Sequence, residues 1–241
     1  MPKDNKKRII HELNFLKSFD EPTPDLFHKI NYKLTKPYFK GKKVLNIGCW
    51  TASFETQFKD DDCQITSIDI SLSALKTAKE ANPHCTFAAA DAFYLPFKDN
   101  SFDVVSLFMV LEHIPKNTEP QLFREVNRVL KTEGLFIIST PRSEFMGNIF
   151  DVAHWLVGHR HYKIDNLRQM LSDQSFEFEK LMLRGGVLAN ISIPFFYLSK
   201  YLFKINLYKQ TFIAKILTWE YEKDGFRDIF LVCKKVKGNE G

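Results

Sequence analysis

The sequence predicts an α/β protein built on a doubly wound, mostly parallel sheet of seven strands. Three observations predict this fold class. Short apolar runs alternate with helical patterns along most of the chain, and such alternation is typical of a parallel sheet. The length of 241 residues is enough for one large α/β domain, and a hydrophobic content of 44% fills its core, which excludes a mainly disordered chain. No linker-like composition divides the chain, so we expect a single domain.

Four short apolar runs predict the first strands of this sheet, at residues 43–47, 64–69, 85–89 and 102–108. Between the first two we expect a helix over 52–59. Ser71 precedes the apolar pattern of residues 72–81, and its hydroxyl can accept a hydrogen bond from a backbone amide in the first turn of that helix.

The remaining elements follow from periodicity and from turn residues. Apolar side chains at helical spacing predict a helix over 119–131, which we expect Gly134 to end, and residues 135–140 predict a fifth strand that Pro141 stops. The first 40 residues predict two short helices, broken at Glu21-Pro22-Thr23-Pro24 because prolines disfavour helix continuation. Beyond Pro141 we expect a helix over 163–173, a strand over 176–183, an aromatic helical segment over about 187–219 and a last strand over 227–236.

The net charge of +5 is unevenly distributed. Residues 1–43 carry 11 basic and 5 acidic side chains, residues 44–184 carry 14 and 19, and residues 185–241 carry 9 and 5. An acidic middle between basic ends is not a nucleic-acid-binding stripe, so DNA is not an expected partner, although an anionic partner stays open.

Cysteine usage and hydropathy indicate a cytoplasmic protein. The four cysteines form no CxxC pattern, so neither a disulfide scaffold nor a zinc site follows from them. The first residues are charged and lack the apolar stretch of a signal peptide. The most apolar run, 187–203, contains Asn190, Pro194 and Lys200 and falls short of the ~20 apolar residues that span a bilayer. We expect a soluble or surface-bound protein.

The turn after the first strand indicates a ligand site. That strand leads into Asn46-Ile47-Gly48-Cys49-Trp50-Thr51-Ala52, and Asp69 ends the second strand 21 residues after Gly48. Open α/β sheets bind ligands outside the carboxyl ends of their strands, near the point where the strand order reverses. An acidic side chain at the end of the second strand can accept hydrogen bonds from both ribose hydroxyls. The pattern therefore predicts a ligand that contains a nucleoside.

The chain resembles the class I S-adenosylmethionine-dependent methyltransferases, most closely the small-molecule group that includes the ubiquinone and menaquinone types. The resemblance covers about residues 43–184 and, more loosely, the last strand. Each motif is weak alone, but the ordered set is specific. It consists of Val44-Leu45-Asn46-Ile47-Gly48-Cys49, Ile68-Asp69-Ile70-Ser71, Ala89-Ala90-Asp91-Ala92, Leu95-Pro96-Phe97, Ser101-Phe102-Asp103-Val104-Val105, Leu111-Glu112-His113-Ile114, and Arg128-Val129-Leu130-Lys131 with Gly134.

The resemblance implies a Rossmann-like methyltransferase that uses S-adenosyl-L-methionine and releases S-adenosyl-L-homocysteine. It implies an N-terminal helical cap (1–42), a cofactor-binding core (43–184), a helical insertion (185–225) and a last strand (226–241). Asp69 would hold the ribose, Asp91 would accept the adenine amino group and Ala92 would offer its amide to the ring. The full set of expected cofactor-binding residues is Asn46, Gly48, Cys49, Trp50, Asp69, Ile70, Asp91, Ala92 and Met109.

The first motif departs from the family pattern, an acid followed by three alternate glycines. Asn46 replaces the acid, and Trp50 and Ala52 replace the second and third glycines. A residue with a β-carbon costs about 1 kcal/mol wherever the backbone needs a positive φ. Trp50 either turns away and covers the pocket, with Asn46 still accepting through its amide oxygen, or it spoils the pocket. We favour a working site, because the residues expected to hold the nucleoside are present.

Methyl transfer needs alignment of acceptor and methyl group, exclusion of water and, for a hydroxyl acceptor, a general base. His113 is the leading candidate for that base, ahead of His154, His159 and His161; its alternative is a structural hydrogen bond at a helix start. The last three lie in a stretch similar to one that closes the acceptor side in the family, and the alternative is a packed lid. No neighbouring carboxylate or cysteine completes a metal shell, so no metal is expected.

Three functions stay open. The leading one is O- or C-methylation of a small-molecule or lipid-linked acceptor, followed by an inactive methyltransferase-like binding or scaffold protein. An RNA methyltransferase is third, because no RNA-binding module is recognisable. Aromatic side chains and lysines alternate over 195–215, which suits a helix at a lipid interface, a wall around an apolar acceptor or a helical cover on the sheet. We expect peripheral membrane contact; the oligomeric state stays open.

Overall fold

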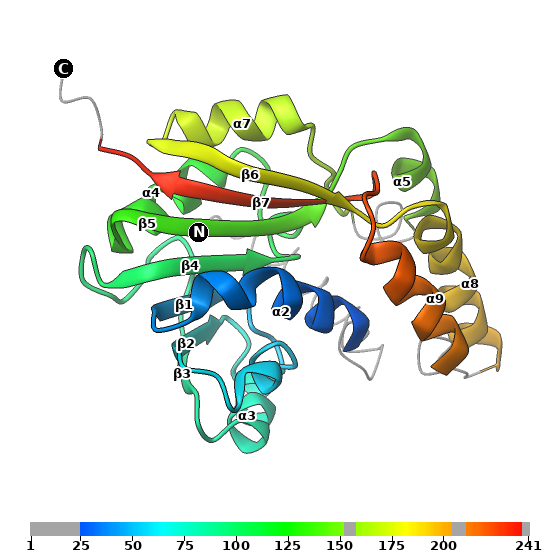
Figure 1. Ribbon diagram of the computed structural model, residues 1–241, viewed down its shortest axis with the longest axis horizontal. Helices are drawn as coiled ribbons and strands as arrows, with labels where there is room; N and C mark the ends of the chain where they lie inside the picture. The colour runs from blue at the N-terminus through cyan, green and yellow to red at the C-terminus, as the bar shows by residue number, and fades with distance from the viewer. Residues whose placement is uncertain (1–24, 152–157, 204–210, 238–241) are drawn as a thin grey trace.

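The computed structural model describes residues 25–151, 158–203 and 211–237, and contains one seven-stranded sheet in the order β3-β2-β1-β4-β5-β7-β6 (Figure 1). Strands β1 to β5 pair in parallel, whereas β7 is antiparallel to both of its neighbours. The strand order reverses at β1, which lies between β2 and β4. The strands are β1 (Lys43–Ile47), β2 (Gln64–Asp69), β3 (Thr86–Ala89), β4 (Phe102–Phe108), β5 (Leu130–Pro141), β6 (Phe176–Arg184) and β7 (Asp228–Lys235).

Helices cover both faces of the sheet and one of its ends. In Figure 1, α2 crosses the near face, α4 and α7 lie on the opposite side, and α5, α8 and α9 gather beyond the end towards which β4 and β5 run. The helical elements are α2 (Asp25–Phe39), the 3-10 turn η1 (Glu55–Phe58), α3 (Leu72–Ala81), α4 (Glu119–Val129), α5 (Phe145–Phe150), α7 (Ile164–Ser172), α8 (Val187–Phe203) and α9 (Thr211–Tyr221).

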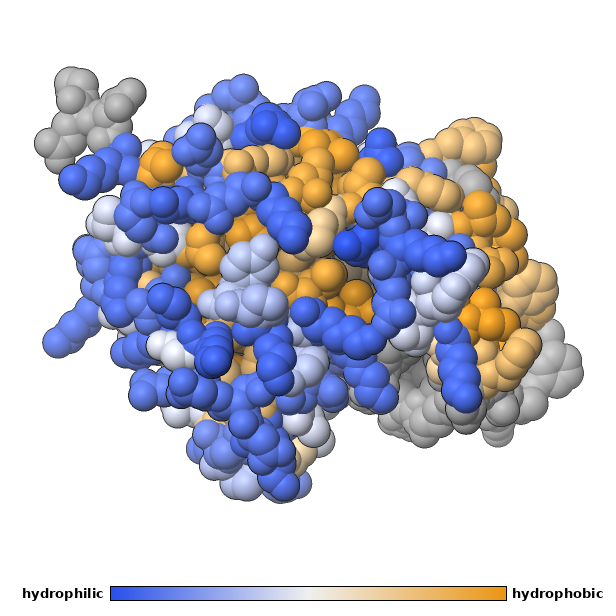
Figure 2. All heavy atoms as spheres, viewed as in Figure 1, coloured by the Kyte–Doolittle hydropathy of each residue, from blue (hydrophilic) through white to orange (hydrophobic). Residues whose placement is uncertain are grey.

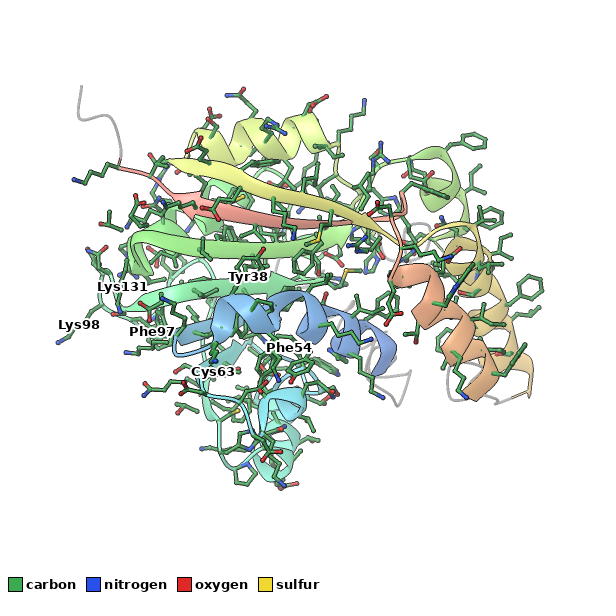
Figure 3. All side chains as sticks on the ribbon, viewed as in Figure 1. Tyr38, Phe54, Cys63, Phe97, Lys98 and Lys131 are labelled. Carbon is green, nitrogen blue, oxygen red and sulfur yellow. The ribbon has the colours of Figure 1, made fainter. Side chains whose placement is uncertain are left out.

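Two cores lie on the two faces of the sheet, which explains why its strands read as nearly continuous apolar runs. On one face, Phe136 and Ile138 of β5 pack in the cluster that includes the apolar stripes of α4 and α7. On the other, Ile137 of the same strand packs with Phe39 of α2 and with Phe54, next to η1. Tyr38 lies against this second cluster and Phe54 belongs to it (Figure 3).

The predicted fold class is confirmed, and most predicted elements lie within two residues of their observed bounds. The Ser71 hydroxyl accepts a hydrogen bond from the Ala74 amide at 3.3 Å, as expected for the residue that begins α3. The helix expected over 52–59 is shorter, a single 3-10 turn. Ala52 has a φ of 60°, which is incompatible with a right-handed helix, so the turn begins after it.

The expectation that Gly134 ends a helix is wrong. Helix α4 ends at Val129, and β5 begins at the next residue, so Gly134 lies inside that strand. Near the start of β5, the residue with left-handed backbone is Glu133, with a φ of 64°. A β-carbon at position 134 would lie 2.8 Å from the Lys131 carbonyl oxygen, and this close approach of backbone requires glycine there.

The region after β5 differs most from expectation. The short helix α5 has no counterpart in the predicted elements, and the aromatic segment 187–219 contains two helices, α8 and α9. The two are tied together by Glu220 of α9, whose carboxylate accepts the backbone amides of Leu188 at 2.9 Å and Ala189 at 2.7 Å. An anion at the first turn of α8 suits the positive end of its dipole.

Candidate functional site

The turn after β1 is left-handed at three alternate residues. Gly48, Trp50 and Ala52 have φ values of 79°, 47° and 60°. A β-carbon at position 48 would lie 2.3 Å from Cγ2 of Val110, so only glycine fits there. Trp50 and Ala52 adopt the conformation that glycine has in the family pattern, at a cost of about 1 kcal/mol each. The altered motif therefore keeps the backbone path of a glycine-rich turn.

Asp69 connects this turn to the end of β2. Its Oδ2 accepts the Trp50 amide and its Oδ1 accepts the Ser71 amide, both at 2.8 Å. Burial raises the pKa of Asp69 above its ordinary value, and the backbone hydrogen bonds oppose that rise. An ionised carboxylate has about four lone-pair sites, so two backbone bonds leave capacity for two further donors. Asp69 can thus bind a pair of ligand hydroxyls while it holds the turn.

Asn46 lies beneath the turn, in a buried polar network. Its amide oxygen accepts the Ser106 hydroxyl at 2.9 Å, and its amide nitrogen donates to Oε1 of Glu55 at 2.7 Å. Ser67 donates to the same Glu55 oxygen at 2.5 Å. Burial raises the pKa of Glu55. Glu55 thus places a carboxyl group beside Asn46, the residue that replaces the acid of the family pattern. The sequence did not indicate this contact, because Glu55 lies nine residues further along the chain.

The other expected nucleoside-binding residues line the ends of β2 and β3. Ile70 follows Asp69 and is 49% exposed, an apolar surface beside a buried carboxylate. The Asp91 carboxylate accepts the Phe93 amide at 3.0 Å and so closes its own turn, with Ala92 half-buried inside it. The Ala90 amide donates to the Asp69 carbonyl at 3.2 Å, which holds the two strand ends together.

These residues fit a nucleoside-bearing cofactor such as S-adenosylmethionine. The left-handed turn leaves no side chain at position 48, the carboxylate of Asp69 retains acceptor capacity, and Ile70 provides an exposed apolar surface for a purine. Cys49 is buried, and burial raises the pKa of its thiol well above the ordinary value. It therefore lines the turn as a small neutral residue and is not a nucleophile.

Met109 begins the second half of the site. It follows β4 with a φ of 52°, and its amide donates to the Ser139 carbonyl at 2.9 Å. The Met109 side chain lines a small pocket that α2 and α9 cover. This hydrogen bond joins the carboxyl ends of β4 and β5. It lies at Met109, which is both a predicted cofactor-binding residue and part of the pocket lining.

Histidines gather around Asp151 on the loops after β4 and β5. The rings of His113 and His159 are in edge-to-face contact, with centroids 4.4 Å apart. Nδ1 of His159 lies 3.4 Å from Oδ2 of Asp151, and Nε2 of His161 lies 2.8 Å from the same oxygen. Burial alone would raise the pKa of Asp151, but hydrogen bonds with both histidines outweigh it and hold that pKa far below the ordinary range.

The stretch that contains these histidines is anchored to the loop after β4. Arg160 donates to the Leu111 carbonyl at 2.9 Å and pairs with Glu119, and the Tyr162 hydroxyl donates to the same carbonyl at 2.8 Å. Beneath it, Glu112 is fully buried, and burial raises its pKa to about 7. Within the described ranges no group of three histidine, cysteine, aspartate or glutamate side chains has metal-binding geometry. His154 lies outside those ranges.

Residues 45–138 match the family described as methyltransferase domain, type 11. The demethylmenaquinone methyltransferase of Renibacterium salmoninarum is 32% identical over 99 residues, which are 41% of this chain and 41% of that protein. Its counterpart from Streptomyces griseus is 37% identical over 97 residues, 40% of this chain and 41% of that protein. This chain therefore spans about two fifths of the length of these relatives.

A longer match is to an uncharacterised protein of Methanocaldococcus jannaschii, MJ0638, which is 31% identical over 160 residues, 63% of this chain and 66% of that protein. Among solved structures, an S-adenosylmethionine-dependent methyltransferase from Archaeoglobus fulgidus has a TM-score of 0.65 at 20% identity and covers 93% of this chain and 99% of its own. The [4+2]-cyclase SpnF has a TM-score of 0.64 at 20% identity, with 89% and 82% covered. The same fold thus carries different reactions. Residues 45–138 belong to the methyltransferase domain family, within a chain that has the fold of the S-adenosylmethionine-dependent methyltransferases.

Proposed function

We propose that this protein transfers the methyl group of S-adenosylmethionine to a small, lipophilic acceptor by O- or C-methylation. One observation carries the proposal: the altered turn keeps its left-handed backbone at Trp50 and Ala52, with Asp69 fastened to it. Strained backbone of this kind is found mainly at active sites and ligand-binding sites. The demethylmenaquinone methyltransferases among the relatives support a small, lipid-like acceptor.

The cofactor would be held by the nucleoside half of the site. Asp69 would bind the ribose hydroxyls, Ile70 would contact the purine, and Asp91 and Ala92 would hydrogen-bond the polar edge of the purine. When bound, S-adenosylmethionine would supply an electrophilic methyl group on its sulfonium. Transfer of that methyl group needs alignment with the acceptor and exclusion of water, and it needs no oxyanion hole. Gly48, Cys49, Trp50 and Met109 would form the walls of the cofactor site, and Asn46 would support the turn through its hydrogen bonds to Ser106 and Glu55. We propose that the chain forms one domain. Its segments are an N-terminal cap (1–42), a cofactor-binding core (43–184), a helical insertion (185–225) and a last strand (226–241).

His113 is the proposed base for a hydroxyl acceptor. Its ring is held against His159, and His159 in turn faces Asp151, whose low pKa keeps it ionised. Asp151 thus orients the His159 ring, and the His159 ring packs against the ring of the proposed base. An acceptor already activated as an enolate would need this group less.

The acceptor side presents an apolar surface to solvent, which suits a lipophilic substrate. Figure 2 shows apolar side chains gathered along the edge of the molecule formed by α8. The segment 187–219 contains four lysines and no acidic residue. We define the apolar surface as Phe145 and Ile149 of α5, Val187, Leu188, Ile191, Phe195 and Leu198 of α8, and Phe212 and Trp219 of α9, all exposed.

We propose that this apolar surface rests on an anionic membrane in the cytoplasm and brings the site to a lipid-borne acceptor. No helix in the described ranges is long and apolar enough to cross a bilayer. Apolar side chains interspersed with lysines are the pattern of interfacial helices. The contact is therefore peripheral, with α5, α8 and α9 at the interface.

An inactive, methyltransferase-like binding protein is the second candidate, and the side chain of Trp50 favours it. Calorimetric titration with S-adenosylmethionine and, separately, with adenosine distinguishes the two. The enzyme requires S-adenosylmethionine to bind with a micromolar dissociation constant. Adenosine binding without S-adenosylmethionine binding would mean that Trp50 blocks the methionine half, and affinity no tighter than millimolar for both would contradict the enzyme altogether.

A further inference from the structure

A row of polar side chains crosses the sheet beneath the turn after β1. Ser67 of β2 and Ser106 of β4 are both register partners of Asn46 of β1. Paired residues of neighbouring strands lie on the same face of a sheet, so the three side chains stand next to one another. They lie on the α2 face, because Val44, two residues before Asn46, packs in the cluster with Phe39 of α2.

Glu55, in the 3-10 turn η1, bonds to two members of this row. Its Oε1 accepts hydrogen bonds from Nδ2 of Asn46 at 2.7 Å and from the Ser67 hydroxyl at 2.5 Å. The amide oxygen of Asn46 accepts the Ser106 hydroxyl at 2.9 Å. A continuous chain of hydrogen bonds therefore runs from β4 through β1 to β2, with the Glu55 carboxyl group as the link between the last two strands.

The chain of hydrogen bonds lies next to the residues that would hold the cofactor. Gly48 follows Asn46 by two residues, and Asp69 follows Ser67 by two. A shift of β1 against β2 would move the left-handed turn relative to the Asp69 carboxylate, which accepts an amide of that turn. Glu55 opposes such a shift, because its carboxyl group is bonded to both strands.

The stability of the core does not account for these polar groups. Glu55 is fully buried, and Phe54 and Phe58 on either side of it belong to the apolar cluster of this face. Apolar side chains of the same shape would serve such a core about equally well, because exchange of both partners of a buried hydrogen bond is nearly neutral. A buried polar network instead specifies one arrangement of the groups that it joins.

The carboxyl group of Glu55 acts in its neutral form. Its partners are an amide and a hydroxyl group, and in the described part of the chain its Oε2 has no hydrogen-bond partner. Burial raises the pKa of Glu55. A buried carboxyl group without a counter-charge keeps its proton. An amide in the same place can therefore make the same hydrogen bonds.

This pair of residues also explains the missing acid of the first motif. The family pattern has an acid at position 46, whereas this chain has Asn46 there with Glu55 2.7 Å away. Two carboxyl groups at this distance would have to share a proton in a buried site. One carboxyl and one amide group avoid that conflict, so an acid at position 55 favours an amide at position 46.

We propose that Glu55 is the positioning residue of the cofactor turn and has exchanged places with the acid of the family pattern, so that its carboxyl group holds β1 and β2 in the arrangement that binds S-adenosylmethionine. The identity of the bound molecule rests on the proposed function; the fixing of the turn does not. Glu55 is fully buried and acts through Asn46 and Ser67, not by contact with the cofactor.

The decisive test exchanges the two groups. In the double variant Asn46→Asp with Glu55→Gln, the glutamine nitrogen can donate to both atoms that bond to Oε1, so the chain of hydrogen bonds is kept. Asn46→Asp alone should weaken S-adenosylmethionine about tenfold in calorimetric titration, and the double variant should return to within about threefold of the parent. Unchanged affinity in Asn46→Asp, or a double variant no better than this single one, would overturn the proposal.

Two further variants separate hydrogen bonding from packing. Glu55→Met keeps the volume and should weaken S-adenosylmethionine at least tenfold, whereas Glu55→Gln should stay within about twofold. The matched control is Thr35→Val, which removes a buried hydroxyl that bonds to the Asn31 carbonyl of its own helix at 2.6 Å and should leave the affinity unchanged. Urea unfolding shows which variants fold. If Glu55→Met does not fold, the exchanged double variant decides.

Amide hydrogen exchange, followed by NMR without cofactor, measures the positioning directly. Glu55→Met should speed exchange of the Gly48 and Trp50 amides at least tenfold, because these amides bond to the end of β2. If exchange is faster but the parent protein does not bind S-adenosylmethionine, the positioning role stands and methyl transfer falls. If the parent and Glu55→Met bind S-adenosylmethionine alike, methyl transfer stands and the positioning role falls.

Discussion

The two halves of the candidate site are built in different ways. In the nucleoside half, the decisive contacts use backbone groups: the amides of Trp50 and Ser71 both bond to the carboxylate of Asp69. We call the loops after β4 and β5, which carry the histidines and Asp151, the proposed acceptor half. There, side chains join distant segments of the chain, as when Arg160 donates to the Leu111 carbonyl. Backbone contacts tolerate exchange of side chains, which explains how the nucleoside half survives the loss of two glycines. The proposed acceptor half depends on side-chain contacts instead, so we expect its side chains to decide specificity.

The buried acid of the acceptor half offers the largest effect. Burial raises the pKa of Glu112 from 4.5 to about 7 in the folded protein. The folded state therefore keeps a proton between these pH values that the unfolded state releases. The stability contributed by this group is fully present below about pH 4.5 and is lost as the pH rises through about 7, a loss of about 3 kcal/mol.

Glu112→Gln should remove that loss, so urea unfolding at pH 5 and pH 8 should differ less in the variant than in the parent protein. Glu80→Gln, an exposed exchange on α3, is the control and should keep the parent behaviour. If Glu112→Gln showed the same fall in unfolding free energy as the parent, Glu112 would be ionised in the folded state already.

The nucleoside half should lose its ligand when its carboxylate is removed. Asp69→Ala should weaken S-adenosylmethionine by about 2–3 kcal/mol, the size of a lost pair of hydrogen bonds to a charged group. Asp91→Ala should cost about half as much, because the backbone of Ala92 still reads the ring. Calorimetric titration measures both. An affinity for S-adenosylmethionine that Asp69→Ala leaves unchanged would show that Asp69 serves the turn alone and that the ribose lies elsewhere.

The apolar surface of α5, α8 and α9 should carry membrane binding. The pair Phe195→Ser and Phe212→Ser should lower the partition onto anionic liposomes by at least about tenfold in co-sedimentation, because two exposed aromatic side chains no longer enter the interface. Leu72→Ser removes an apolar side chain that is 74% exposed on α3 and should leave partitioning unchanged. Binding should weaken at high salt; no binding at low salt would exclude this surface.

The smallest effect tests the tolerance of the nucleoside half. Ala52→Gly should raise the free energy of unfolding by up to about 1 kcal/mol, because glycine adopts a φ of 60° without strain. Ala78→Gly replaces a buried alanine inside α3 and should instead lower it by about 1 kcal/mol. Thermal and urea unfolding measure both. Loss of stability in both variants would mean that the turn is not strained at Ala52.

Local residues predicted the nucleoside half of the fold. The runs at β1, β2 and β4, the Ser71 cap and the order of the motifs depend on neighbours within a few residues, so they are readable along the chain. The fold class and the family followed from these, and Asp69 and Gly48 followed from their positions at strand ends. Gly134 shows the limit of this reasoning: glycine is needed there because the Lys131 carbonyl of β5 and the Asp103 carbonyl of β4 both approach its α-carbon closely, and not because it ends a helix.

The sequence by itself determined the sheet and the departure from the glycine pattern, and it predicted the residues of the proposed nucleoside half. Only the tertiary structure decided that the departure keeps left-handed backbone, that Glu55 stands beside Asn46, and that Asp151 holds two histidines. It alone brought Ser139 of β5, Arg184 of β6 and Asp228 of β7 to one pocket. The physical reason is register: which side chains meet across strands depends on pairing between distant segments, and no spacing along the chain records it.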